Sequence, residues 1–578
     1  MPVPRLFRAV VRPLVPALVV AGVLVVGAPD SWASVTPLAG EGFAQPTVSN
    51  DWVRPVAATG TNLACLTAGT NVTQSPVPGC NLATPDAAGS GALRLTSNAN
   101  SQVGANFYQT SLPTTAGIDL TFNSYQWNAT VGGADGIALV MAAADPANPA
   151  PPTTTGQVGG YLGYSTSGAL NGLTDAYLGM GEDVFGNFAN SGLSGTGCGA
   201  PPAGLLANTP YPESLTVRGP GNGSAGYCLL GSTAQVSHLS TTGSSNLAGG
   251  FLDKPSATSR PAAVPVEVAI NPTSAAVTTA SGLAVAAKSW VMATTPYGAS
   301  QQTVSGLLPT TANTPLLGTA FPASWINPAT GIPYQLTFGW TAGTGGSTEV
   351  HEIGSLLATT LTGPLPVLTL ANTDNQGGAQ LAGSTTSYTL TPGVSASGAA
   401  ETLPITVTDT LPAGITPGTA TGTGWTCSTS GQVVTCTYPS SPSVPAGTTL
   451  PAITVPATVS SAASGSRTAT ARISSNDGNP DLAADTTTVT QFTASAVPVS
   501  TPHGHAVTLA TAGIPAGAAG SVAFTSGATT LCTAVLPATS CLTSTTLPPA
   551  SYPVTATYTG SSYGTLTAAT SFTVTVAG

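Results

Sequence analysis

Apolar and polar residues alternate with a period of two through much of this chain. Short runs rich in Val, Leu, Ile and Thr, such as residues 215–218 (LTVR) and 266–270 (VEVAI), are separated by Gly and Pro. This alternation predicts β-strands with one buried face, and the Gly and Pro residues predict the turns between them. No segment shows the spacing and end caps of an amphipathic helix, and Lys, Glu and Gln are sparse. The pattern therefore predicts an all-β protein.

The first 33 residues have the features of a secretory signal. Three arginines precede an apolar run over residues 14–26, and residues 31–33 (SWA) place small side chains at both cleavage-determining positions. The apolar run is too short for a membrane span, and no later stretch approaches twenty uninterrupted apolar residues. We therefore expect cleavage after Ala33 and a secreted, extracellular mature chain without a membrane span. Retention at the cell surface would need a partner or a further signal.

The eight cysteines form four pairs of sequence neighbours. In an exported chain such spacing predicts four local disulfides, namely Cys65–Cys80, Cys198–Cys228, Cys427–Cys436 and Cys532–Cys541. The chain has no CxxC spacing and no cluster of Cys and His. A structural zinc site or a thiol redox site is therefore not expected.

Charged residues are rare, and most of them are acidic. The chain has 11 Lys and Arg against 21 Asp and Glu, a formal net charge of −10 at pH 7. So few cations leave no electrostatic footprint for nucleic acid. A neutral surface of Ser, Thr, Asn and Gly suits partners recognised by hydrogen bonds, such as carbohydrate. The same surface would also serve solubility alone.

Four short motifs lie in a fixed order within the first 360 residues. They are residues 134–136 (ADG), 159–163 (GGYLG), 183–187 (DVFGN) and 339–346 (GWTAGTGG). Each alone is an ordinary loop sequence, but their order resembles the sugar-binding loops of legume-type (L-type) lectins. The resemblance spans residues 42–362 and implies a concanavalin-like (jelly-roll) sandwich of two sheets, with a glycan site at one edge.

The resemblance implies a role for particular residues of these loops. It assigns the sugar contacts to six residues, Asp135, Gly159, Gly160, Asn187, Gly345 and Gly346. Asp135 would accept hydrogen bonds from sugar hydroxyls and would follow a cis peptide bond. Tyr161 and Phe185 are candidates for stacking on a sugar ring, with core packing as the alternative.

The resemblance also implies a bound Ca²⁺ ion. The carboxylate of Asp183, the carbonyl of Phe185 and the amide oxygen of Asn187 would ligate it, because calcium takes hard oxygen ligands. Two positions depart from the family. Gly181 replaces the Glu of a transition-metal site, which is therefore not expected, and Gly192 replaces a further Asp. The alternative for Asp183 and Asn187 is capping of a tight loop without an ion.

Two further β-units are predicted after a boundary near residues 363–366 (GPLP). The first contains residues 408–414 (TDTLPAG), 424–427 (GWTC) and 476–480 (NDGNP) in order, and resembles the conserved-repeat domain of bacterial surface proteins. The second resembles a bacterial immunoglobulin-like repeat. Both resemblances imply Ig-like sandwiches. The expected organisation is a signal peptide (1–33), a lectin-like sandwich (34–364), a conserved-repeat domain (365–490) and an Ig-like repeat (491–578).

The sequence does not indicate an enzyme. Glycoside hydrolysis needs two carboxyl groups that face one cleft, whereas Glu182 and Asp183 are adjacent and project to opposite faces of a strand. His351 is expected to be a structural residue on an edge strand. The leading hypothesis is a secreted carbohydrate-binding protein, assisted by calcium, with two Ig-like spacers. The alternative is an adhesive or structural surface protein whose first domain has the lectin fold but binds protein, or nothing.

Overall fold

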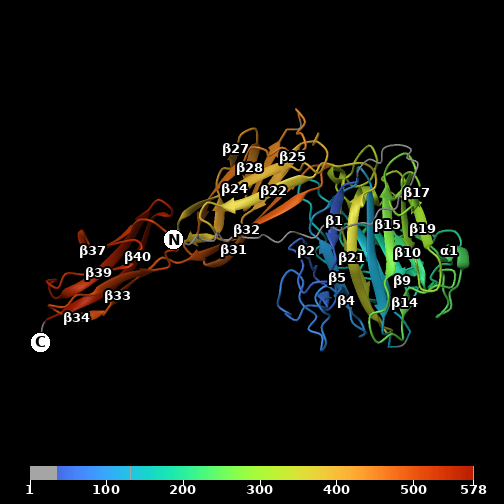
Figure 1. Cartoon of the computed structure of the whole chain (residues 1–578), viewed down its shortest axis with the longest axis horizontal. Coiled ribbons are helices and arrows are strands. Elements are labelled where there is room, and N and C mark those ends of the chain that lie inside the picture. Colours follow the sequence, from blue (N-terminus) through green and yellow to red (C-terminus); the bar gives the residue numbers. More distant parts are fainter. Residues whose placement is uncertain (1–34, 131, 315, 440, 577–578) are drawn as a thin grey trace, which may run out of the picture.

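The structure is a computed structural model that describes residues 35–130, 132–314, 316–439 and 441–576. It is all-β, as predicted. Among the described residues, α-helix is limited to two four-residue segments, α1 (Ala234–Ser237) and α2 (Leu317–Ala320). None of the described helices has the length and apolar character needed to cross a membrane. The predicted signal peptide lies outside the described residues. Three β-bodies follow one another along the long axis (Figure 1).

The first body, residues 37–360, contains two large sheets. The first sheet has the order β19 (Gln302–Leu307), β18 (Ser289–Thr294), β15 (Val264–Asn271), β7 (Ile118–Trp127), β21 (Val350–Thr360), β4 (Leu93–Thr96) and β3 (Cys65–Leu66). Beside this path, β1 (Pro37–Glu41) pairs with β21, and β14 (Asp253–Lys254) pairs with β7.

The second sheet of the first body carries the predicted sugar-binding loops. It has the order β12 (Ala225–Gly226), β11 (Gly221–Asn222), β9 (Ala176–Asp183), β8 (Gly136–Ala144), β20 (Gln335–Gly343), β5 (Val103–Tyr108) and β2 (Trp52–Val53). Off this path, β10 (Ser214–Arg218) pairs with β9 and with β13 (Leu229–Ser232), and β6 (Leu112–Pro113) pairs with β20. A small hairpin joins β16 (Val277–Thr278) and β17 (Ala284–Val285).

Both faces of the second sheet are buried. Every residue of β8, β9 and β20 is buried. One face packs on the first sheet through a large apolar cluster that includes Trp52 and Trp340. The other face is covered by loop residues, whose cluster includes Leu162, Tyr164 and Phe188. This cover explains why β8 reads as a continuous apolar run (GIALVMAAA), and it fixes the loops at the edge of the sheet.

The second and third bodies each have two sheets and a separate apolar cluster. One sheet of the second body has the order β22 (Leu368–Asp374), β24 (Thr385–Val394), β30 (Ile453–Val459) and β26 (Ile415–Pro417), and β27 (Thr421–Gly422) also pairs with β30. Its other sheet has the order β23 (Ala379–Leu381), β32 (Asp481–Thr490), β31 (Gly465–Ser474), β25 (Ile405–Thr410), β29 (Val433–Tyr438) and β28 (Thr426–Ser430). In the third body, one sheet has the order β33 (Thr493–Val497), β35 (Thr508–Ala512) and β38 (Ser540–Leu542). The other sheet has the order β34 (Ser500–Pro502), β40 (Gly564–Thr575), β39 (Ala550–Gly560), β36 (Ser521–Ser526) and β37 (Thr529–Val535). The predicted domain boundaries and the Ig-like assignment stay predictions.

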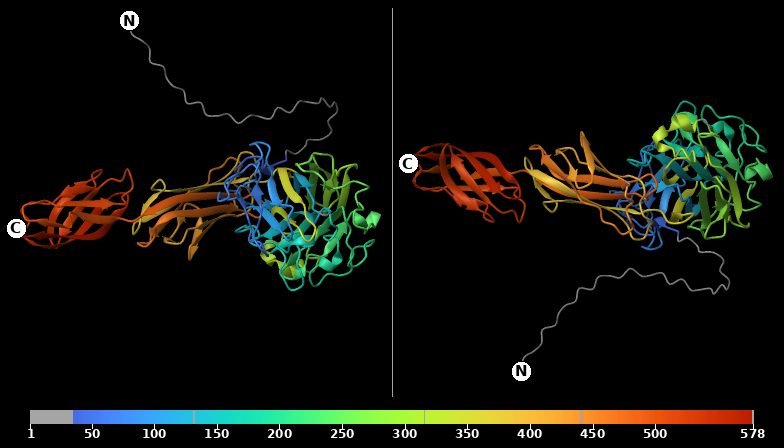
Figure 2. Two further views of the ribbon diagram at one scale, coloured as in Figure 1. Left: turned by 90° about the horizontal axis from the view of Figure 1, so that it is seen from below. Right: turned by 90° about the horizontal axis from the view of Figure 1, so that it is seen from above.

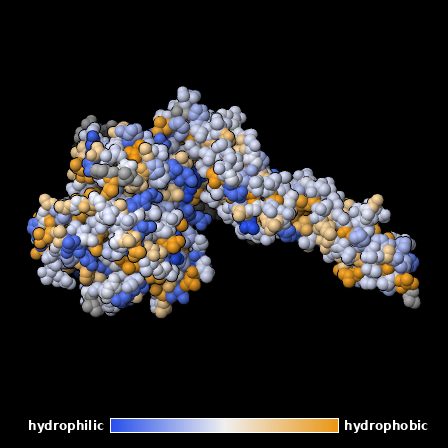
Figure 3. Space-filling view, turned by 180° about the vertical axis from the view of Figure 1, so that it is seen from behind, coloured by the Kyte–Doolittle hydropathy of each residue, from blue (hydrophilic) through white to orange (hydrophobic). Residues whose placement is uncertain are grey.

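All four predicted disulfides are present, Cys65–Cys80, Cys198–Cys228, Cys427–Cys436 and Cys532–Cys541. On the face shown in Figure 3, pale shades of intermediate hydropathy dominate and strongly hydrophilic residues form small patches. The views of Figure 2 show the same linear arrangement of the three bodies from below and from above.

The predicted edge-strand position of His351 is wrong. His351 lies in β21, between β7 and β4, and its side chain is fully buried. The polar neighbours that suggested an exposed edge are themselves buried. Glu352 is paired with Arg94 at 2.8 Å and with Arg260 at 2.6 Å, so its charge is compensated inside the fold.

Candidate functional site

The strand register of the second sheet brings three predicted loops to one edge. Gly343 at the end of β20 is opposite Gly136 at the start of β8, and Gly136 is opposite Asp183 at the end of β9. The loop before β8, the loop after β9 and the loop after β20 therefore emerge side by side. The short 3₁₀ helix η1 (Gly159–Tyr161) joins them, because its Gly159 lies against Gly343.

Asp135 is the central polar side chain of this edge. Its peptide bond to Ala134 is cis, as the resemblance implies. Its backbone N–H donates to the Gly343 carbonyl at 3.0 Å, and its own carbonyl accepts from the N–H of Val184 at 3.1 Å. The loop before β8 is thus tied to both neighbouring loops.

The carboxyl group of Asp135 is buried and only partly satisfied. The Asn187 side chain and the Gly345 N–H act on it as hydrogen-bond donors, the Gly345 N–H being shared with the Ser347 carbonyl at 3.3 Å, while its Oδ2 atom has no hydrogen-bond partner. Burial raises the pKa of Asp135 to about 7, and the two hydrogen bonds oppose that shift. Asp135, Asn187 and Gly345 come from three different loops, so the structure brings together the core of the predicted site.

Two of the glycines around Asp135, Gly160 and Gly345, leave little room for a side chain. A Cβ atom on Gly160 would collide with the Asn187 side chain, and one on Gly345 would lie 3.1 Å from Asp135 Oδ2. Gly159 has a φ of +68°, a conformation that glycine adopts without strain. Gly346 is exposed at the rim, and its carbonyl accepts from the Asn100 side chain at 2.9 Å. All six residues predicted to contact sugar therefore lie in this group of loops.

Asp183 holds the loop after β9 by hydrogen bonds. The side chain is fully buried, Oδ1 accepts from the Gly186 N–H at 2.8 Å, and Oδ2 accepts from the Ala189 N–H at 2.7 Å. Burial raises the pKa of Asp183 to about 7 against the effect of these bonds. This geometry is the loop capping that the sequence left open as the alternative to metal binding.

The implied calcium ion has an incomplete set of ligands. The loop offers the Asp183 carboxylate, the Phe185 carbonyl and the Asn187 amide oxygen, whereas calcium takes about six to eight oxygens. Near Gly192, where the family has a further Asp, Asn190 Oδ1 instead accepts the Gly192 N–H at 2.9 Å. Across the described ranges, no group of three or more His, Cys, Asp and Glu side chains is arranged to hold a metal. These residues do not by themselves make a calcium shell.

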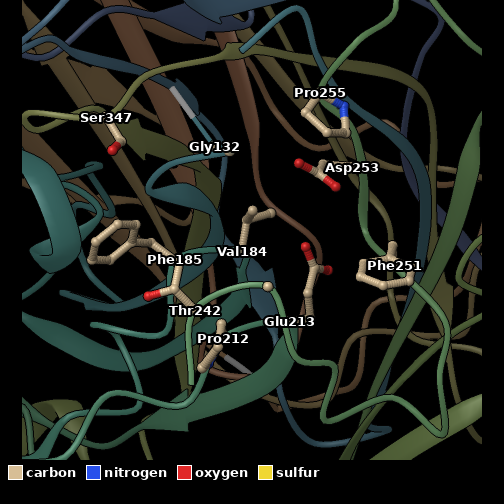
Figure 4. Close-up of a pocket in the computed structure, with 12 residues that line it drawn as sticks. Gly132, Val184, Phe185, Pro212, Glu213, Thr242, Phe251, Asp253, Pro255 and Ser347 are labelled. Atoms are coloured by element: carbon tan, nitrogen blue, oxygen red, sulfur yellow. The ribbon is translucent and has the colours of Figure 1, made fainter. Parts of the chain in front are cut away.

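Tyr161 and Phe185 are both half-buried, and neither belongs to an apolar core cluster of the described residues. Phe185 lines a cavity of about 410 Å³ beside the Asp135 loops. Other lining residues include Val184, Glu213, Phe251, Asp253 and Ser347 (Figure 4).

Three buried carboxyl groups at this cavity were not predicted from the sequence as functional residues. Glu213 and Asp253 line the cavity and share a hydrogen bond, and the Glu349 carboxyl lies close behind Asp253. Burial, and then the neighbouring carboxyls, raise the pKa of Glu213 and Glu349, and burial raises the pKa of Asp253 to about 6. The only available signal was the rarity of acidic residues in this chain. Their convergence from residues more than 30 apart depends on the fold.

Comparison with known proteins finds similarity only among solved structures. No family model and no curated protein matches the chain. Lectin I-B4 from Griffonia simplicifolia, in a metal-free form, is 12% identical with a TM-score of 0.30, covering 55% of this chain and 98% of the lectin. The lectin from Bauhinia forficata in complex with GalNAc is 12% identical with a TM-score of 0.30, covering 57% and 99%.

A third similar structure is the exoplasmic/lumenal domain of VIP36 in its Ca²⁺/Man3GlcNAc-bound form. It is 16% identical with a TM-score of 0.25, and the match covers 47% of this chain and 80% of that domain.

Proposed function

We propose that this chain is a secreted, lectin-like carbohydrate-binding protein whose first body binds glycan at the Asp135 loops. The observation that carries the proposal is the Asp135 carboxyl, which is buried, fixed by Asn187 and Gly345, and left with one oxygen unpartnered. A buried acceptor without a donor costs free energy, about 1–3 kcal/mol, and a ligand hydroxyl can supply the missing hydrogen bond.

The rigidity of the loops favours this use. Sugar hydroxyls are strongly hydrated, so a protein gains from binding them only if its own polar groups are ordered beforehand. Here the Asp135 backbone is hydrogen-bonded to two neighbouring loops, and Asp183 caps the loop that carries Asn187. The site therefore has little conformational entropy left to lose on binding.

Binding without hydrolysis is the mode that we propose. The Glu213 and Asp253 carboxyls are directly hydrogen-bonded to each other, whereas a retaining glycosidase keeps its two carboxyls roughly 5 Å apart and an inverting one keeps them farther apart still. Glu182 is fully buried and accepts from Ser124 Oγ at 2.8 Å inside the sandwich.

A glycan array on the full secreted chain tests the proposal. We expect the wild type to bind a set of glycans and Asp135→Asn to lose at least about tenfold in affinity, because the amide NH₂ must either face the donors of Asn187 and Gly345 or replace the unpartnered Oδ2 acceptor. Asp145→Asn is the matched control, since Asp145 only caps a turn through the Ala147 N–H. Equal glycan binding by Asp135→Asn and the wild type would overturn the proposal. Adhesion to protein without any glycan signal would favour the structural or adhesive alternative.

Calcium assistance stays a prediction for this site. Since the Asp183 carboxylate already holds its loop through two backbone N–H groups, we expect EDTA to weaken glycan binding less than Asp135→Asn does. Complete loss of binding in EDTA, with recovery on adding calcium, would show that the ion is indispensable and that the capping hydrogen bonds are not enough.

A further inference from the structure

The cavity beside the Asp135 loops combines apolar walls with two carboxyl groups. Val184, Phe185 and Phe251 supply apolar surface, and the Glu213 and Asp253 side chains lie near each other in the middle of the cavity lining (Figure 4). Phe185 and Ser347 belong to loops of the proposed glycan site, so the cavity adjoins that site. Its volume of about 410 Å³ is within the range of small-molecule sites.

The carboxyl groups of this cavity form no ion pair within the described residues. Glu213 and Asp253 are each only 4% exposed, and no ion pair of the described residues includes either of them. The nearby Lys254 places its ammonium group 4.4 Å from the centre of the Tyr297 ring. Within the described residues, one backbone group donates to the Glu213 side chain, the Leu252 N–H at 2.7 Å from Oε2.

Behind the cavity, Glu349 is a third carboxyl group, and it lacks a hydrogen-bond donor. It is fully buried, and neither of its carboxyl oxygens accepts a hydrogen bond from an N–H or hydroxyl group. His351 Nε2 lies 3.3 Å from Glu349 Oε1, but burial lowers the pKa of His351 to about 3, so this ring is neutral at physiological pH. Three carboxyls thus converge without an ion pair among the described residues, and the charge of the nearby Lys254 has only the smallest of several effects on the pKa of Asp253. Glu349 is buried without a donor.

We propose that this cavity binds the protonated amine of an amino sugar, with the ammonium group between Glu213 and Asp253 and the sugar ring between Phe185 and Phe251. The proposal rests on the proposed glycan-binding function for the identity of the ligand, and it adds a ligand class to that function. A primary ammonium has three N–H donors and a full positive charge. It would supply further donors, and the counter-charge that no ion pair within the described residues gives to the two carboxyls. The aromatic side chains suit the apolar face of a pyranose and attract a nearby cation.

An ammonium ion fits this site better than a divalent metal ion. Calcium needs about six to eight oxygens at roughly 2.3–2.6 Å, whereas the carboxyls here are hydrogen-bonded to one another and do not form a metal-holding group within the described residues. An ammonium group is satisfied by two carboxyls at ordinary hydrogen-bond distance. It replaces the proton that the Glu213–Asp253 pair shares.

Calorimetry on the full chain compares glucosamine and galactosamine with their N-acetylated and neutral counterparts. We expect each free amine to bind at least about tenfold more tightly than its N-acetyl form, because acetylation removes the charge. Asp253→Asn should abolish this preference, and Thr242→Trp should block the cavity from its exposed rim while keeping both carboxyls. Asp145→Asn should change nothing. The melting temperature of each variant reports whether it is folded.

Cyclohexylamine separates this proposal from the glycan-binding function. It carries an amine on an apolar ring without hydroxyls, so its binding should depend on Asp253 and should survive Asp135→Asn. Its binding together with unchanged glycan binding by Asp135→Asn would sink the proposed function alone. Equal affinity for free and acetylated amines, unchanged amine binding by Asp253→Asn and Thr242→Trp, or Asp253-dependent uptake of calcium in place of amines would each overturn the amine site.

Discussion

Buried carboxyl groups are compensated in two different ways in this molecule. Glu352 is paired with two arginines, Arg94 and Arg260. Asp409 in β25 is also fully buried, but neither of its oxygens has a hydrogen-bond partner. Burial, and secondarily the charge of Asp485, raise the pKa of Asp409 to about 7. Glu352 thus faces two guanidinium groups, whereas Asp409 has no hydrogen-bond donor and burial disfavours its charged form.

Asp409→Asn should flatten the pH dependence of stability. A raised pKa in the folded state means that the folded protein keeps a proton that the unfolded chain releases, so stability falls as pH rises from about 4 to about 7. Asparagine cannot ionise. Over that pH window the free energy of unfolding should therefore fall by on the order of 3 kcal/mol less in the variant than in the wild type. Urea unfolding at pH 4.5 and pH 8 measures the difference. Identical pH slopes would show that Asp409 ionises freely in the folded protein.

At the residue scale, the sequence predicted the loop residues but missed the cavity carboxyls. Asp135 and Asn187 stand in short motifs whose order carries information, and the structure places them together. Glu213, Asp253 and Glu349 stand in no motif. Their proximity depends on where β10, β14 and β21 begin, and one-dimensional periodicity does not contain that information.

Strand ends, more than strands, position the candidate site. The aligned ends of β8, β9 and β20 place three loops together, and Asp183 at the last position of β9 fixes the loop that follows. Both of its oxygens accept backbone N–H groups of the loop after β9. The side chain thus supplies acceptors that no neighbouring strand offers to this loop.

Asp183→Ala should loosen the loop over residues 184–190. Two buried N–H groups, those of Gly186 and Ala189, would lose their acceptors at a cost of about 2–4 kcal/mol in total. Hydrogen exchange at these amides should accelerate, and the melting temperature should fall.

Asn190→Ala is the matched comparison for that variant. It removes a single exposed cap, the bond to the Gly192 N–H, and should cost about 1 kcal/mol or less. Exchange at Gly186 and Ala189 that is unchanged in Asp183→Ala would contradict the capping role.

At the element scale, the sequence predicted strands better than their place in the sheet. Period-two patterns indicated the all-β class, but His351 was assigned to an edge because its neighbours are polar. The structure buries those neighbours with Arg94 and Arg260. Polar residues in a strand usually indicate an exposed position, but here ion pairs between residues far apart in the sequence allow them to be buried.

The first and second bodies are joined by hydrogen bonds as well as by the chain. The side chain of Gln335, fully buried in β20, donates to the Ser475 carbonyl at 2.9 Å and to the Gly478 carbonyl at 3.2 Å. Arg472 of the second body donates to the Gln109 carbonyl at 2.9 Å. These bonds link the sheet that carries the candidate site to the second body, which gives the arrangement in Figure 1 a physical cause.

Gln335→Ala should make the first junction more flexible. The variant leaves the Ser475 and Gly478 carbonyls without this donor, so we expect small-angle X-ray scattering to show a broader distribution of long intramolecular distances. Gln376→Ala removes a bond to the Ser562 carbonyl at the second junction. It serves as the control because it should leave the first junction unchanged. Unchanged scattering from Gln335→Ala would mean that the junction is fixed by other contacts.

At the scale of the whole molecule, the sequence predicted a chain of β-units but not how they meet. Gly- and Pro-rich segments and changes of motif suggested where units end, because such features are local. The bond from Gln335 to Ser475 joins residues 140 positions apart, and neither residue has a local sequence context that predicts it.

The most direct test of glycan binding is a crystal structure of the chain with the strongest glycan from the array. We predict a sugar hydroxyl within hydrogen-bond distance of Asp135 Oδ2, the acceptor that has no partner in the free protein, and a second one near the Asn187 side chain. A glycan bound elsewhere, with Asp135 still buried against Asn187 and Gly345 and touching no sugar, would contradict the account.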